Sequence, residues 1–223
     1  ISVPPTILFS LIGNHPDVRK AVSSDFKRPG DMIYLLGQTH QELGASELSY
    51  MLREEGRGGI GGAIPQIDAE RNLAAYRELS TAMSGGLVAS AHDCSDGGLA
   101  VALVECCFGA DAGASVTING LWSDCEHLDT WGALFGESLG RILVSIRPED
   151  CEAFEATMAD HSCHLLGAVT TGDAITFFHN GETSNAVVST TVCSSARQTS
   201  GRYRRIQSAR PAMPDCPAAG SSG

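Results

Sequence analysis

Long apolar stretches are missing from this chain of 223 residues. No run approaches the roughly 20 apolar residues that a membrane-spanning helix requires, so we expect no membrane partner. Charged residues are also scarce, at 18%, whereas hydrophobic residues make up 43% of the chain. This balance excludes global disorder and predicts a sizeable core. The N-terminus lacks the basic segment that a secretory signal peptide needs.

Closely spaced cysteine pairs are missing as well. The chain has eight cysteines, but no CxxC motif occurs among them. One interpretation is a set of buried thiols in a reducing cytoplasm. The other is a zinc site, for which His161, Cys163 and His164 are too close in sequence to supply the usual paired knuckles. We therefore expect free thiols and a cytoplasmic protein.

Basic charge is too scarce for a general nucleic-acid binder, because the net charge is 15 − 26 = −11 and a polyphosphate would be repelled. Residues 194–223 differ from the rest, since they carry five Arg against one Asp and leave 10 − 25 = −15 for the remainder. That segment has no periodicity and few large apolar residues, which predicts a disordered tail. The alternative is a basic arm for an acidic partner.

Two common catalytic signatures are also absent. The glycine-rich run from Gly56 to Pro65 is not followed by GK[ST], so we interpret it as a mobile loop rather than a nucleotide cradle. No GxSxG motif occurs, and His92 and Cys94 would point to opposite faces of an extended segment. The sequence therefore argues against nucleophilic catalysis by serine or cysteine.

The apolar patterns predict an α+β fold, a mixed β-sheet packed with helices, because strands and helices alternate without a strict βαβ repeat. A hairpin around residues 171–173 is expected to close the fold. The second helix should bury a stripe formed by Leu73, Tyr76, Leu79 and Met83. The predicted strands are 7–12, 32–36, 87–90, 116–118, 141–146, 165–169 and 175–179, and the predicted helices are 42–53, 68–83, 99–108, 131–135 and one opening at 148–150.

The first candidate site is the segment His92–Gly98, between a predicted strand and a helix N-terminus. Such a position offers unpaired N–H groups and a positive dipole end, so Ser95, Gly97 and Gly98 could bind phosphate. Asp93 and Asp96 would repel a bare phosphate but could hold Mg²⁺ together with phosphate oxygens. The alternative is purely structural: Ser95 or Asp96 caps the helix, and the glycines allow close packing.

The second candidate site is the segment Gly136–Arg141, at the start of a strand. Glu137, Ser138 and Arg141 bring together a carboxylate, a hydroxyl and a guanidinium. The guanidinium could hold a phosphate or carboxylate as a bidentate fork. Equally, Arg141 could pair with Glu137 as an ion pair at the end of the strand.

These two motifs, with others in the same order and spacing, resemble one family. The further motifs are SVPPTILFSLIG, GDMIYLLG, LGASE and ILVSIRPEDCEAFE. Over about residues 1–190 the chain resembles the C-terminal part of the synthetase subunit of phosphoribosylformylglycinamidine synthase, in the superfamily of aminoimidazole ribonucleotide synthetase. The SVPPT and HDxSxGGL forms resemble the second of that protein's two homologous halves.

The resemblance implies a ligase of purine biosynthesis that uses ATP, Mg²⁺ and ammonia derived from glutamine. Such an enzyme converts formylglycinamide ribonucleotide to its amidine, with ATP activating the formamide oxygen. In the first half of such a protein the equivalent of FGESLGR is part of the substrate pocket, so the resemblance implies that Glu137, Ser138 and Arg141 line the corresponding pocket of this half, which is auxiliary or structural rather than catalytic. It implies no catalytic residue in this chain, because the family's catalytic histidine and main ATP and Mg²⁺ residues lie in other domains.

The resemblance also implies a domain organisation and partners. Residues 1–12 would end a preceding ATP-binding domain, residues 13–193 would form a C-terminal α+β domain, and residues 194–223 would be the disordered tail. The expected partners are the upstream domains, a glutaminase domain or subunit and the ribonucleotide, and the isolated chain is expected to be inactive. The alternatives are a non-catalytic scaffold of that enzyme or a related synthetase of the same superfamily.

Overall fold

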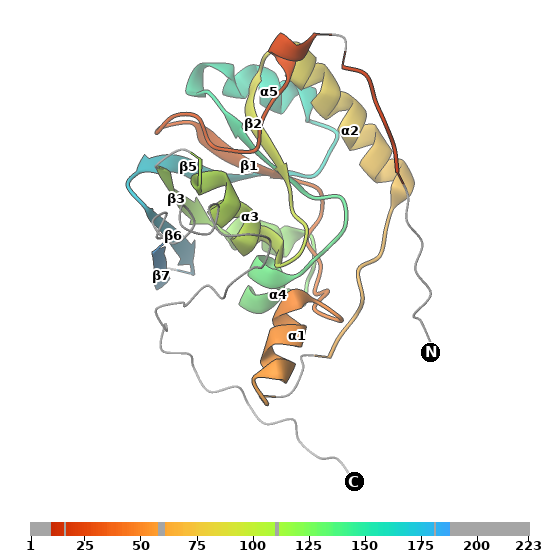
Figure 1. Ribbon diagram of the computed structural model, residues 1–223, viewed down its shortest axis with the longest axis vertical. Coiled ribbons are helices and arrows are strands. Elements are labelled where there is room, and N and C mark those ends of the chain that lie inside the picture. The colour runs from red at the N-terminus through yellow and green to blue at the C-terminus, as the bar shows by residue number, and fades with distance from the viewer. Residues whose placement is uncertain (1–9, 16, 58–60, 110–111, 181, 188–223) are drawn as a thin grey trace.

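The computed structural model describes residues 10–15, 17–57, 61–109, 112–180 and 182–187 (Figure 1). The strands are β1 Met32–Leu36, β2 Val88–Asp93, β3 Ala112–Thr117, β4 Ile142–Ile146, β5 Cys163–Thr171, β6 Ala174–His179 and β7 Glu182–Val187. The α-helices are α1 Glu47–Glu54, α2 Ala69–Ser84, α3 Gly98–Cys107, α4 Thr130–Phe135 and α5 Cys151–Thr157. The 3₁₀ helices are η1 Val18–Lys20, η2 Asn119–Ser123 and η3 Pro148–Asp150.

The strands form one mixed sheet in the order β2-β4-β1-β5-β3-β6-β7. Only the β3–β6 pair is parallel among the described strands, and the other neighbours run antiparallel. The predicted α+β class with a mixed sheet is therefore confirmed. Among the helices of the described residues, none combines the length and the apolar character that crossing a bilayer would need.

Helices cover both faces of the sheet, because the central strands bury side chains on both sides. In β1, Ile33 and Leu35 join the core under α3 and α4, whereas Tyr34 and Leu36 join the core under α2 and α5. This alternation follows from the two-residue period of a strand. The result is three layers, with α3 and α4 on one face and α2 and α5 on the other (Figure 1).

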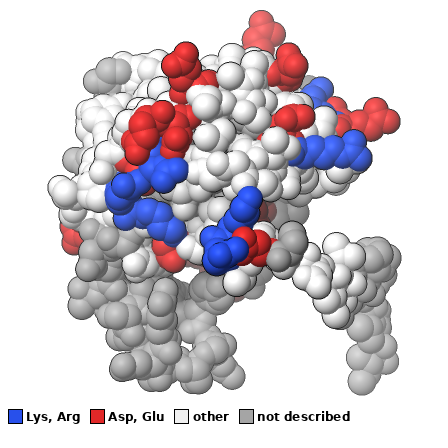
Figure 2. All heavy atoms as spheres, turned by 90° about the horizontal axis from the view of Figure 1, so that it is seen from above, with Lys and Arg blue, Asp and Glu red and all other residues white. Residues whose placement is uncertain are grey.

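The surface around α5 carries charges of both signs. Figure 2 shows acidic and basic side chains interspersed on the face seen from above. Two ion pairs at this end of the molecule join Arg19 to Asp17 and Arg147 to Asp150. The negative net charge therefore does not produce a single-sign surface here.

The predicted hairpin of residues 165–179 is wrong, because β3 lies between β5 and β6 in the sheet. The connection between the two strands passes over Gly113, where a Cβ atom would lie 2.2 Å from the carbonyl oxygen of Ala174. The sequence predicted the turn between β5 and β6 correctly. The strand that lies between them, β3, comes from 50 to 60 residues earlier in the chain.

Three further predictions differ from the structure. The helix expected from residue 42 begins at Glu47, because Ala45 has φ +60° and the Ser46 side chain caps the backbone N–H of Ser49. On α2, Leu79 is buried, but Leu73 and Tyr76 are 50% and 40% exposed. Of the predicted strand 7–12, residues 10–12 form no strand, and Leu11 and Ile12 are almost fully exposed, since none of the described strands pairs with them; residues 7–9 lie outside the described residues.

The predicted domain boundaries stay predictions. Residues 1–9 and 188–223 lie outside the described residues, so the expected disorder of residues 194–223 is not described either. The cysteines of the described part are all free, with Cys94, Cys106 and Cys107 buried.

Candidate functional site

The turn between β2 and α3 depends on two glycines in the left-handed region. Gly97, the N-cap of α3, has φ +79°, and Gly98 has φ +65°. A Cβ atom on Gly98 would lie 2.4 Å from the carbonyl oxygen of Gly136 and 3.0 Å from that of Leu134. Gly98 therefore allows the end of α4 to approach the first turn of α3, which brings the two sequence-predicted segments together.

The carboxylate of Glu137 lies at the N-termini of two helices. Its Oε1 atom accepts hydrogen bonds from the backbone N–H groups of Gly97, at 2.9 Å, and of Glu47 in α1, at 2.8 Å. A helix N-terminus has unpaired donors and a positive dipole end, both of which attract an anion. In this structure the chain's own carboxylate fills that role at α3.

Ser138 and Arg141 are both buried, at 1% exposure. The Ser138 hydroxyl oxygen accepts from the backbone N–H of His40 at 3.0 Å. The guanidinium of Arg141 donates through Nε to the carbonyl oxygen of Ser138 at 3.2 Å and through the other two nitrogens to Thr39 Oγ1 and the carbonyl oxygen of Gly136. These bonds hold the Gly136–Arg141 loop against the segment that follows β1.

Burial lowers the pKa of Arg141, while the carboxylates of Glu42, Asp124 and Glu137 oppose that shift. Glu42 is 5% exposed and accepts a hydrogen bond from the backbone N–H of Gln66 at 2.9 Å. Arg141 was predicted either to bind an anion or to pair with Glu137 as an ion pair. The structure places its guanidinium among backbone and hydroxyl oxygens instead.

The exposed part of the site consists of Asp93, Ser95 and Asp96. The side chain of Asp93 is 73% exposed, and the Ser95 hydroxyl donates to its Oδ2 atom. This hydrogen bond holds the pKa of Asp93 below its usual range. The candidate residues therefore divide into three exposed residues, Asp93, Ser95 and Asp96, and a supporting set in which Gly97, Gly98, Ser138 and Arg141 are buried and Glu137 is partly exposed.

Sequence reasoning missed the residues that hold this loop from the β1 side. Thr39, His40 and Glu42 contact the Gly136–Arg141 segment from about 100 residues earlier in the chain. Glu42 was assigned to a helix, and the LGASE motif was the only signal nearby. A polar segment after a buried strand gives no indication of which loop it will contact.

A serine, a histidine and an aspartate meet elsewhere, which the sequence did not indicate. His164 Nε2 lies 3.1 Å from Ser162 Oγ and 3.0 Å from Asp124 Oδ2. Both partners contact the same ring nitrogen, whereas a catalytic relay uses the two nitrogens separately. Asp124 Oδ2 also accepts from the backbone N–H of Thr39. This cluster therefore joins η2 to β5 as a structural hydrogen-bond network.

The domain that contains this site matches a known protein family. The model for the family described as AIR synthase related protein, C-terminal domain, matches residues 28–180. The chain belongs to this family. The predicted kinship with the aminoimidazole ribonucleotide synthetase superfamily is thereby confirmed.

Solved structures share the fold. PurL of Thermotoga maritima complexed with FGAR matches with a TM-score of 0.65 and 17% identity, covering 89% of this chain and 33% of that chain. The same protein complexed with ATP matches with a TM-score of 0.58 and 18% identity, covering 78% and 27%. The hydrogenase maturation protein HypE in complex with ATP matches with a TM-score of 0.52 and 20% identity, covering 75% and 53%. The chain thus spans between a quarter and a third of these PurL chains.

Proposed function

We propose that this chain is a C-terminal domain of a phosphoribosylformylglycinamidine synthase. That enzyme converts formylglycinamide ribonucleotide and glutamine-derived ammonia to the amidine at the expense of ATP. The observation that carries the proposal is the contact between the HDCSDGGL turn and the GESLGR loop through Glu137 and Gly97. Both segments resemble motifs of that synthase. Solved PurL complexes with ATP, ADP, AMPPCP and FGAR support a nucleotide-dependent function for the family fold.

The exposed carboxylates at the start of α3 suit a magnesium ion. Asp93 and Asp96 provide hard oxygen donors, and Mg²⁺ in phosphate sites uses one or two carboxylates with phosphate oxygens. Among the described residues, no group of three or more His, Cys, Asp and Glu side chains could hold a metal. A phosphate ligand would therefore complete the coordination. When bound, Mg²⁺ and ATP would supply charge neutralisation and a transferable phosphoryl group.

In this proposal the residues of the chain bind and orient but do not transfer protons. Ser95 donates a hydrogen bond to Asp93, and this contact lowers the pKa of the carboxyl group, which favours the ionised form that a cation binds. Glu137, Ser138 and Arg141 fix the Gly136–Arg141 loop, which in this proposal borders the auxiliary pocket of this half. We propose no catalytic residue, and we expect catalysis to require the upstream domains and a glutaminase in the cytoplasm.

Titration of the 223-residue chain tests this proposal. Isothermal calorimetry with Mg·ATP and with formylglycinamide ribonucleotide should show weak or no binding, and an amidine assay should show no turnover. The same domain within the whole synthase should bind Mg·ATP, and Asp93→Asn should weaken that binding about tenfold by removing one charged ligand. Turnover by the isolated chain would disprove the dependence on other domains.

A non-catalytic scaffold is the second candidate function. It is favoured by the buried state of Ser138 and Arg141 and by the capping role of Glu137. Asp93→Asn and Ser95→Ala in the whole synthase separate the two candidates, because both residues are exposed and neither change should disturb folding. Full activity and unchanged Mg²⁺ affinity in both variants would establish the scaffold.

A related synthetase of the same superfamily is the third candidate, since the HypE fold also matches. The whole protein assayed with formylglycinamide ribonucleotide and with alternative acceptors distinguishes this candidate. Turnover of another acceptor alone would favour it.

A further inference from the structure

A cavity of about 220 Å³ lies between the end of β1 and the first turns of α2. The segment between α5 and β5 closes another side, and the turn before β4 completes the wall. The lining residues are Gly37, Gln38, Arg71, Asn72, Ala75, Gly140, Asp160, His161 and Ser162. Apart from Gly140, this cavity shares no residue with the two candidate segments described above.

Contacts between the walls preform the cavity. The backbone N–H of Gly37 donates to the carbonyl oxygen of Ser162 at 2.9 Å, and the Ser162 hydroxyl donates back to the Gly37 carbonyl at 3.3 Å. A Cβ atom on Gly140 would lie 2.1 Å from Asn72 Nδ2, so this turn packs directly against α2. The walls are thus fixed by the chain itself before any ligand binds.

The lining is polar. Ala75 contributes its only apolar side chain, and Gly37 and Gly140 contribute backbone atoms alone. Arg71 is positioned by two neighbours: its guanidinium donates to Gln38 Oε1 and lies 3.2 Å from Asp68 Oδ2. The Arg71 and Asp68 side chains are about half exposed, so water screens the attraction between them. The guanidinium can therefore also bind a second anion. A guanidinium matches the geometry of carboxylate and phosphate oxygens.

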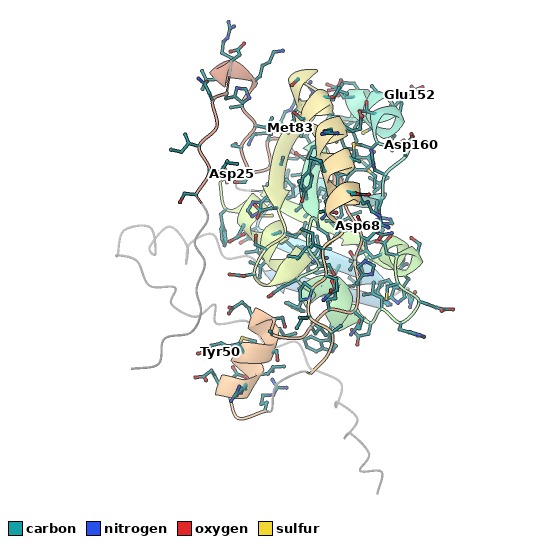
Figure 3. The ribbon with its side chains drawn as sticks, turned by 90° about the vertical axis from the view of Figure 1, so that its right-hand side faces the viewer. Asp25, Tyr50, Asp68, Met83, Glu152 and Asp160 are labelled. Atoms are coloured by element: carbon teal, nitrogen blue, oxygen red, sulfur yellow. The ribbon has the colours of Figure 1, made fainter. Side chains whose placement is uncertain are left out.

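Acidic groups also surround the cavity and limit what can bind. Figure 3 shows Asp68 at the start of α2 and Asp160 after the end of α5, on the same side of the molecule. These carboxylates would repel a polyanion such as a nucleoside triphosphate. The volume is also below the roughly 300 to 1,000 Å³ that is typical of sites for drug-sized ligands. Charge and size together favour a small anion of low charge.

We propose that this cavity binds a small oxyanion, phosphate or carboxylate, through the guanidinium of Arg71. The side chains of Asn72 and His161 lie in the same lining and provide further hydrogen-bond donors. The carboxylate of Asp160 accepts from a hydroxyl or ammonium group when the ligand carries one. This site is independent of the proposed synthase function, so each can fail without the other.

A heteronuclear NMR titration of the 223-residue chain tests the site. Sodium phosphate and sodium acetate are added in separate series at constant ionic strength, with sodium chloride as the reference. Saturable shifts at the amides of Gly37, Asn72 and Ser162 are expected in at least one series, and the stronger series identifies the anion class. Shifts that match the chloride reference in both series would overturn the proposal.

Substitutions of Arg71 test whether the anion binds at this cavity. Arg71→Ala should weaken it at least about tenfold, the effect of losing one charge-assisted contact, whereas Arg71→Lys should retain part of it. Arg77→Ala is the matched control, because it removes the same charge from the exposed surface of the same helix. Equal affinity in Arg71→Ala and Arg77→Ala would overturn the proposal.

A second variant tests the cavity without changing any charge. Ala75→Leu places a larger side chain in the lining and should abolish the saturable shifts while leaving the remaining spectrum that of a folded chain. Unchanged binding in a folded Ala75→Leu chain would show that the anion binds elsewhere.

Discussion

Oε1 of Glu137 lies 2.9 Å from the backbone nitrogen of Gly97, 40 residues earlier in the chain. The same atom lies 2.8 Å from the backbone nitrogen of Glu47. One carboxylate therefore binds an N-terminal N–H group of each of two helices: α3 has no side-chain cap from its own N-cap residue, whereas α1 is also capped by Ser46. This carboxylate also joins α1, which lies at the opposite end of the molecule from α5 in Figure 1, to the body of the domain.

Removing this shared cap should destabilise the fold. Glu137→Ala is expected to lower the free energy of unfolding by about 2 kcal/mol, since a single cap contributes about 1 kcal/mol. Glu137→Gln keeps an acceptor oxygen and should lose about half as much. Urea denaturation measures both, with Glu126→Ala as an exposed control within about 0.5 kcal/mol of the parent. Identical midpoints for Glu137→Ala and the control would contradict the capping role.

Gly98 should tolerate no side chain. Gly98→Ala combines strain at φ +65° with a contact of 2.4 Å to the Gly136 carbonyl, and we expect a loss of about 3 kcal/mol or more. Gly86→Ala is the matched control, because Gly86 has φ +78° with nothing within 4 Å, so only about 1 to 2 kcal/mol should be lost. Urea denaturation compares them, and equal losses would mean that the close approach to α4 is unimportant.

Asp31 should make stability depend on pH. It is 2% exposed, its Oδ2 atom has no hydrogen-bond partner among the described residues, and burial raises its pKa, although Arg28 at 3.9 Å from Oδ1 opposes that rise. A carboxyl group with a raised folded-state pKa favours folding most at low pH, and that contribution is lost as pH rises through the folded pKa. At pH 7 the ionised Asp31 therefore costs stability.

Asp31→Asn removes this cost while keeping the shape of the side chain. The variant should be more stable than the parent by about 1 kcal/mol at pH 7, the lower end of the penalty for a buried unsatisfied group. The difference should shrink as pH falls through the raised folded-state pKa of Asp31 towards the unfolded value of 3.8. Thermal unfolding from pH 3.5 to 8 measures it, and a parent that is the more stable form at pH 7 would refute the expectation.

The buried cysteines should resist alkylation. Burial raises the pKa of Cys94 to about 11 and that of Cys107 to about 12. At pH 8 the thiolate, which is the reactive form, would then be about one in a thousand molecules or fewer at either site. Iodoacetamide labelling followed by mass spectrometry should modify the partly exposed Cys125 before Cys94 and Cys107, which should react only in urea. Rapid labelling of Cys94 in the native chain would contradict this.

Apolar runs and glycine positions in the sequence predicted the bounds of β1, of β4 and of the end of α2. The apolar run at 32–36 coincides with β1, and the run at 141–146 contains β4, because a continuous apolar stretch suits a strand buried on both faces. Helix α2 ends at Ser84 before Gly85 as expected. Leu73 and Tyr76 were assigned to the buried stripe, but periodicity shows only that they share a face with Leu79. It does not show how far along the helix the partner surface extends.

The candidate site was predicted in composition but not in arrangement. The helix-terminal glycines and the Gly136–Arg141 loop were proposed because backbone N–H groups and the Arg141 guanidinium suit anions, and their role in binding stays a prediction. Glu137 was not expected to cap α3, and Arg141 was not expected to be buried among carbonyl oxygens. Both outcomes depend on contacts between segments that are about 40 and 100 residues apart, and hydrogen-bonding partners at such distances leave no periodic signal.

The insertion of β3 between β5 and β6 has a consequence for how the chain folds. The two later strands are joined by a tight turn and could pair with each other within microseconds, before the distant β3 reaches them. Such a hairpin would have to open again to admit β3, so it would be a kinetic trap rather than a nucleus. The two-residue connection between β5 and β6 thus favours a non-native strand pairing, and refolding should speed up when that turn is made less favourable.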